Sequence, residues 1–127
     1  MRKIIPTLLM IILGAAIMFV LSLLQGKPNP PAGEYHYSNI LRENHTWIAI
    51  TVQSIVGLAL GYFYRFNPFR IGLSLIAIFP ITALIEATIY RGSHNLIPFE
   101  LIIHFGYGLP AVAAGFAGKL LSKKLRN

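Results

Sequence analysis

Long apolar runs alternate with short polar segments along this chain of 127 residues. Each run holds close to the roughly 20 residues with which an α-helix crosses about 30 Å of hydrocarbon. Inside lipid every backbone N–H and C=O group has to be paired within its own segment, so these runs predict helices. The predicted spans cover residues 4–24, 47–64, 69–90 and 98–121. We therefore expect an all-α membrane protein, an antiparallel bundle of four transmembrane helices that forms one domain.

The polar connections set the order of these helices. The turn at residues 65–69 and the loop at residues 91–97 are short, so the helices that each one joins are predicted to be antiparallel neighbours. The connection at residues 25–44 is longer and lies on the outer side. Its residues 27–31 include three prolines, and we expect them to be extended because proline fixes φ and lacks an amide donor.

Lysines and arginines predict an orientation, because positive residues near helix ends are retained in the cytoplasm. Of the 11 such residues, eight lie on the side that holds both termini, namely Arg2, Lys3, Arg65, Arg70, Lys119, Lys123, Lys124 and Arg126. The opposite side holds the other three, Lys27, Arg42 and Arg91. We expect an integral protein of the bacterial cytoplasmic (inner) membrane, with its N and C termini in the cytoplasm.

The formal net charge of +7 follows from this topology and does not indicate nucleic-acid binding. The expected partner is the lipid bilayer, since 55% of the residues are hydrophobic. Anionic headgroups can also attract the basic C-terminal segment, residues 119–126. The chain has 0 cysteines, which excludes disulfides, thiolate metal sites and a cysteine nucleophile.

Small residues recur at a spacing of four in the second and fourth predicted helices. In lipid such positions let two helix backbones approach closely. The residues concerned are Gly57, Gly61, Ala111, Ala114, Gly115 and Gly118. Packing within the bundle is the first interpretation; the alternative is a contact in a homo-oligomer or a larger membrane complex.

Two prolines lie inside predicted spans. Pro80 is in the middle of residues 69–90, and Pro110 is in the middle of residues 98–121. Proline removes a helical hydrogen bond and clashes with the carbonyl group one turn earlier, so we expect both helices to kink near these positions.

The candidate chemistry lies on the predicted outer half, which holds all four carboxylates and all four histidines of the chain. Glu86, Glu100 and His104 lie inside predicted spans, where an ionisable group is costly and points to function. Glu100 and His104 are one turn apart, and the short loop at residues 91–97 brings their helix close to that of Glu86. We expect Gln53 and His45 to face the same region.

A structural explanation remains open for each of these groups. Glu100 stands in the first turn of its helix, where a carboxylate is favoured by the helix dipole. Glu86 and His104 would then form a polar cluster that holds helices together. A divalent metal is a further alternative, since zinc takes three or four histidine and carboxylate ligands. His94 would add a ligand, although no specific motif indicates a metal.

Three functions follow, in decreasing order of preference. The first is a binding or transport protein with an outward-facing pocket for a cation or a small ligand. The second is a structural or accessory membrane subunit that acts through helix–helix contacts. The third is a membrane-embedded enzyme that uses glutamate and histidine as acid and base. It ranks last because the sequence contains no recognisable catalytic motif.

Overall fold

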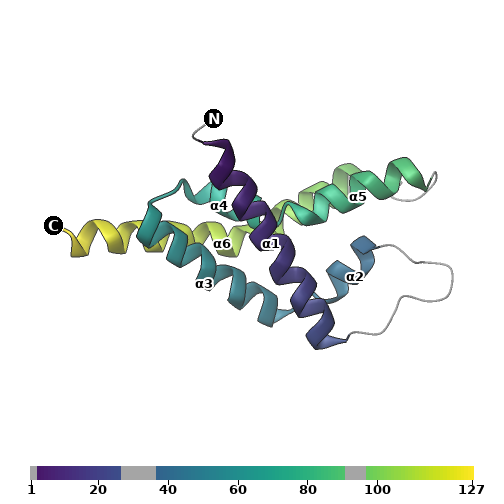
Figure 1. Ribbon diagram of the computed structural model, residues 1–127, viewed down its shortest axis with the longest axis horizontal. Helices are drawn as coiled ribbons and strands as arrows, with labels where there is room; N and C mark the ends of the chain where they lie inside the picture. The colour runs from purple at the N-terminus through teal and green to yellow at the C-terminus, as the bar shows by residue number, and fades with distance from the viewer. Residues whose placement is uncertain (1–2, 27–36, 91–96) are drawn as a thin grey trace.

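The computed structural model describes residues 3–26, 37–90 and 97–127, and within these ranges the chain is helical and contains no strand. The helices, shown in Figure 1, are α1 (Ile4–Gln25), α2 (Tyr37–Glu43), α3 (Trp47–Tyr64), α4 (Pro68–Leu75), α5 (Ile78–Ile89) and α6 (Ile97–Leu125). Three of them, α1, α3 and α6, are long and apolar enough to cross a membrane. The bent pair of α4 and α5 makes a fourth span if it is counted as one.

The third predicted span, expected over residues 69–90 as one helix with a kink near Pro80, is formed by two helices. It consists of α4 and α5, whose axes are bent by 46° at the break between them. Pro80 stands in the first turn of α5. Because proline has no N–H and its ring excludes the carbonyl group four residues earlier, an unbroken helix through Ile76 is disfavoured. By contrast, α6 continues through Pro110 as one helix.

The loop expected over residues 25–44 also contains regular structure. Gln25 completes α1, and residues 37–43 form the short helix α2. The three prolines at residues 28–31 lie outside the described residues. Helix α2 packs against α5 and α1, so this part of the connection returns to the bundle instead of extending away from it.

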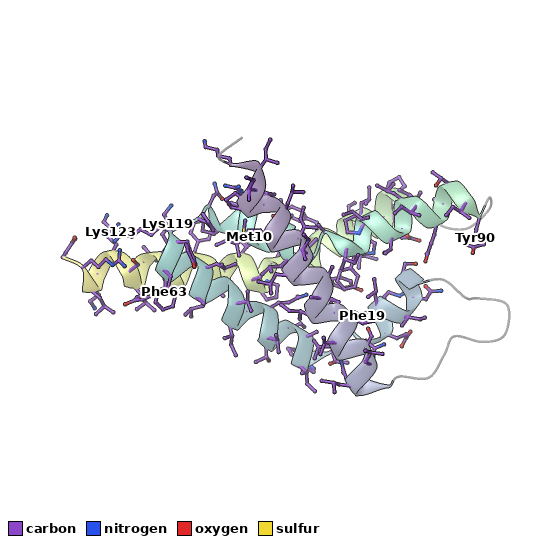
Figure 2. All side chains as sticks on the ribbon, in the orientation of Figure 1. Met10, Phe19, Phe63, Tyr90, Lys119 and Lys123 are labelled. Carbon is purple, nitrogen blue, oxygen red and sulfur yellow. The ribbon has the colours of Figure 1, made fainter. Side chains whose placement is uncertain are left out.

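Helix α6 is the axis of the molecule. Figure 1 shows it along most of the long dimension, and α1 crosses the bundle at an angle. Helices α3, α4 and α5 all pack against α6, whereas α1 packs mainly against α4 and α3. The side chains turned away from these contacts are largely apolar, as Figure 2 illustrates; Leu24, Ile55 and Leu120 are more than 60% exposed. These are the faces that a bilayer would cover.

Helices α3 and α6 approach each other at small residues, which we call the glycine seam and which comprise Gly57, Gly61, Ala111 and Gly115. A Cβ atom on Gly57 would lie 2.7 Å from the carbonyl oxygen of Ala111, and one on Gly61 would overlap the carbonyl oxygen of Gly115. Gly118 makes a similar approach to the backbone of α3 at Leu58. Any side chain larger than hydrogen at Gly57, Gly61 or Gly118 would push α3 and α6 apart.

Candidate functional site

The connection between α2 and α3 is held by side-chain hydrogen bonds to the end of α1. The Nε2 of Gln25 donates to the carbonyl oxygen of Asn44 at 2.9 Å, and the hydroxyl of Thr46 donates to Oε1 of Gln25 at 2.7 Å. The side-chain amide of Asn44 donates to the carbonyl oxygen of Ile40 at 2.8 Å, and the backbone N–H of Asn44 donates to the same oxygen at 3.2 Å. Both hydrogen bonds satisfy an acceptor at the end of α2. His45, between Asn44 and Thr46, is thereby placed on a braced segment.

His45 is half-buried and lies among aromatic rings. Its ring stacks on Tyr107 with 4.3 Å between centroids, and it meets Phe79 edge-on at 5.3 Å. Its Nε2 lies 3.4 Å from Oε1 of Gln53. Burial lowers the pKa of His45, and the hydrogen bond to Oε1 of Gln53 opposes this only in part. The imidazole is therefore neutral at pH 7 and can donate or accept a hydrogen bond.

His104 approaches the same two rings from α6. Its ring centroid lies 5.8 Å from that of Phe79 and 5.9 Å from that of Tyr107. Phe79 and Tyr107 in turn contact each other edge-on at 5.2 Å. We call this group, drawn from four parts of the chain, the polar–aromatic cluster; its members are His45, Gln53, Phe79, His104 and Tyr107.

Gln53 has an unusual place in the polar–aromatic cluster. The side chain is 1% exposed, and its Nε2 has no hydrogen-bond partner among the residues that the structure describes. A buried polar group without a partner costs on the order of 1–3 kcal/mol, so native proteins keep few of them. The Nε2 of Gln53 is therefore a buried donor that a hydrogen-bond acceptor from outside the described chain could satisfy.

Glu86 has protein partners on α2. The backbone N–H of Ser38 donates to Oε1 of Glu86 at 3.0 Å, and the Ser38 hydroxyl donates to Oε2. The carboxylate is 5% exposed, so these two hydrogen bonds compensate for part of its burial. Glu86 thus joins α5 to α2, a contact that requires residues 37–43 to be helical and close to the bundle.

The other predicted site residues are more scattered. Glu100 is half-buried in the first turn of α6. His94 lies outside the described residues. Within residues 3–26, 37–90 and 97–127 there is no group of three or more histidine, aspartate or glutamate side chains that could hold a metal ion. The metal alternative therefore has no site in these ranges.

Several residues of this region were not singled out from the sequence. Ser38 and Asn44 belong to a connection that carried no helical expectation. Phe79 resembled any apolar residue of a span, and only its contacts with two histidines distinguish it. Tyr107 offered a weak signal, because it follows His104 by three residues and so shares a helix face with it.

Comparisons with known proteins give no relative from which a function could be transferred. No protein-family model, curated protein or solved structure matches this chain.

Proposed function

We propose that this chain is a four-span membrane protein that binds a small polar ligand at the polar–aromatic cluster, on the outer side of the membrane. The observation that carries the proposal is the buried Nε2 of Gln53, which lacks a partner in the described chain and lies on the side chain that meets the neutral His45. An unpaired donor calls for an acceptor, which favours a ligand with an oxygen or nitrogen lone pair over a bare cation. The partly exposed ring of Tyr107 suits a ligand with a planar or apolar part.

The proposed topology places both termini in the cytoplasm and α4 with α5 together as the third span. It rests on the positive-inside rule. The placement of the basic residues supports it, since Figure 2 shows Lys119 and Lys123 at one end of the molecule and Tyr90, which follows α5, at the opposite end. The polar–aromatic cluster would then lie between the middle of the bilayer and its outer face, because His45 precedes α3 on the outer side and Phe79 lies beside the break in the middle of the third span.

The second candidate is an accessory or structural subunit. It is favoured by a different observation, namely that Glu86 is bound by both donors of Ser38. A carboxylate used in this way stabilises the fold and is not free to carry a substrate. This candidate predicts that the polar residues affect assembly and stability, with no ligand-dependent effect.

The two candidates are separated by thermal unfolding of the purified protein in detergent, with small metabolites that carry acceptor groups and, separately, with Zn²⁺ and Na⁺. A ligand at 100 times its Kd should stabilise the wild type by about 2.7 kcal/mol. Gln53→Met should abolish that stabilisation because it removes the donor but keeps the volume. Thr51→Ala, an exposed position on the same helix, is the matched control and should retain it.

The binding proposal would be wrong if no compound in the panel raised the melting temperature of the wild type and Gln53→Met unfolded at or above the wild-type temperature. That result would mean that the buried amide is only a local defect, and it would leave the accessory role as the better explanation.

A further inference from the structure

A hollow far along α6 from the polar–aromatic cluster lies between the end of α3 and the last turns of α6. Its volume is about 550 Å³. We call it the basic groove, and it is lined by Arg65, Phe116, Lys119, Leu120, Lys123 and Asn127. Figure 2 shows Lys119 and Lys123 at this end of the molecule. The function proposed above makes no use of it.

The helical spacing of the lining gives the basic groove an apolar floor and a charged rim. Phe116 and Leu120 are one turn apart, and Lys119 and Lys123 are one turn apart beside them, so all four share one face of α6. Lysine stems cover apolar surface while the ammonium groups remain near water. A molecule in the groove would meet aliphatic and aromatic surface below and positive charge above.

Arg65 completes the groove from α3 and is held in place. Its Nε donates to the hydroxyl of Ser122 at 3.0 Å, and its Nη2 donates to the carbonyl oxygen of the same residue at 3.3 Å. Arg65 has a φ of 51°, and within the described ranges no other residue except a glycine has a positive φ. This left-handed conformation ends α3 at its C-cap and turns the chain toward α4, so the position of Arg65 is fixed by the backbone as well as by Ser122.

The side chains that line the basic groove carry positive charges and no negative one. Arg65, Lys119 and Lys123 contribute three positive side chains, and none of the six lining residues is an aspartate or a glutamate. Guanidinium and ammonium groups that converge in this way bind phosphate, the arginine through its planar fork and the lysines as point charges.

We propose that the basic groove binds the headgroup of an anionic phospholipid. The phosphate lies among Arg65, Lys119 and Lys123, and the start of an acyl chain lies on Phe116 and Leu120. A lipid is favoured over free phosphate because the floor is apolar and because α6 is a membrane-spanning candidate whose basic residues begin at Lys119. The groove therefore lies at the depth where headgroups meet the hydrocarbon.

The test measures lipid binding to the purified full chain by native mass spectrometry and by the melting temperature in detergent. The probes are phosphatidylglycerol, the zwitterionic phosphatidylcholine and inorganic phosphate. We expect phosphatidylglycerol to bind and to raise the melting temperature, with little effect of the other two. Lys119→Gln and Lys123→Gln should each weaken phosphatidylglycerol binding by about fivefold, the effect of one basic residue near a charged membrane surface.

The matched control is Lys124→Gln, which removes the same charge from the neighbouring position on α6 but lies outside the groove lining. It should leave the affinity within about twofold of the wild type, since only the general field changes. Arg65→Gly provides a second variant, in which glycine accepts the positive φ without cost while the two hydrogen bonds to Ser122 are lost. It should bind phosphatidylglycerol at least about fivefold more weakly.

Three results would overturn the proposal. If Lys124→Gln and Lys123→Gln weakened phosphatidylglycerol binding equally, the binding would depend on net charge and not on the groove. Equal binding of phosphatidylcholine would show a non-specific apolar contact. Saturation of the groove by inorganic phosphate, with loss of lipid binding, would assign it to a free anion. None of these results depends on the ligand proposed for the polar–aromatic cluster, so the two proposals can fail separately.

Discussion

The glycine seam and the polar–aromatic cluster join the same helix, α6, to its neighbours by opposite means. At the seam, Gly57 and Gly61 bring the backbone of α3 against that of α6 with no side chain between them. At the cluster, two histidines and two large rings fill the space between α6, α5 and the start of α3. The seam is closed by the absence of side chains, and the cluster, one turn away on both α3 and α6, is filled by polar and aromatic ones.

This difference follows from the way in which helices associate in lipid. Between helices in lipid there is little hydrophobic gain, so close backbone packing and interhelical hydrogen bonds are what stabilise association. A backbone contact cannot adapt to a ligand, because nothing in it can rotate. The cluster contains side chains with rotatable bonds and the unpaired donor of Gln53, so it is the region where binding is physically feasible.

The largest expected effect is at the seam. Gly61→Val would place a branched side chain against the carbonyl oxygen of Gly115, where only backbone could move to relieve the clash. Overpacking of this kind costs about 3 kcal/mol, near the upper end of the usual range. The free energy of unfolding in mixed micelles measures it. A loss below 0.5 kcal/mol, roughly the level of neutral surface changes, would mean that the seam is loose.

A smaller effect is expected where α2 meets α5. Glu86→Gln leaves one acceptor oxygen for the two donors of Ser38 and should cost about 2 kcal/mol. Ser38→Ala keeps the backbone N–H bond and should cost about 1 kcal/mol. A double-mutant cycle on unfolding free energies tests the contact directly, because additive effects would show that the two residues are not coupled.

Acid should destabilise the fold through the cluster. The pKa of His45 is lowered in the folded chain by burial, so below the unfolded value of 6.5 the unfolded chain binds a proton that the folded chain resists. The contribution of His45 is thus fully present above pH 6.5 and is lost as the pH falls below it. We expect the melting temperature to drop between pH 7.5 and pH 5.5 by less in His45→Phe than in the wild type. If the melting temperatures of the two proteins fell equally, a group other than His45 would cause the sensitivity to acid.

The smallest effect should come from a glycine of α6 outside the seam. A Cβ atom on Gly106 would have no neighbour within 4 Å, so Gly106→Ala should change the free energy of unfolding only through its helix propensity. Alanine is favoured over glycine inside a helix by up to about 1 kcal/mol, and the variant should be equal to or slightly more stable than the wild type. Comparison of Gly106→Ala with Gly61→Val shows whether the effect of replacing a glycine depends on its contacts with a neighbouring helix. If Gly106→Ala also lowered the free energy of unfolding, the contrast between the seam and the rest of α6 would be wrong.

Much of the helical pattern can be predicted from the sequence, because the length of an apolar run is a local property. The span predicted over residues 47–64 has the same ends as α3, and that over 4–24 ends one residue before α1 does. The break between α4 and α5 was harder to place, since a proline indicates a disturbed helix but not whether the chain bends or starts again. Helix α2 was missed because its seven residues lack a span-length apolar run.

The candidate site was only partly predictable. Glu86 and His104 attracted attention because ionisable groups in a span are rare, and both are buried in the structure. Which groups they meet depends on where α2 returns to the bundle, and nothing local encodes that. Ser38 becomes a partner of Glu86 across 48 positions of sequence, a pairing that hydrophobic patterning does not address.

By itself, then, the sequence determined the helical class, the membrane-length spans and the small-residue positions, because these depend on hydrophobicity and size read along the chain. The tertiary structure decided which glycine meets which carbonyl group, that Ser38 binds Glu86, and that Arg65 joins two lysines around one groove. These features depend on the rotation and crossing of helices relative to one another, which are set by many weak contacts acting together and not by any single stretch of residues.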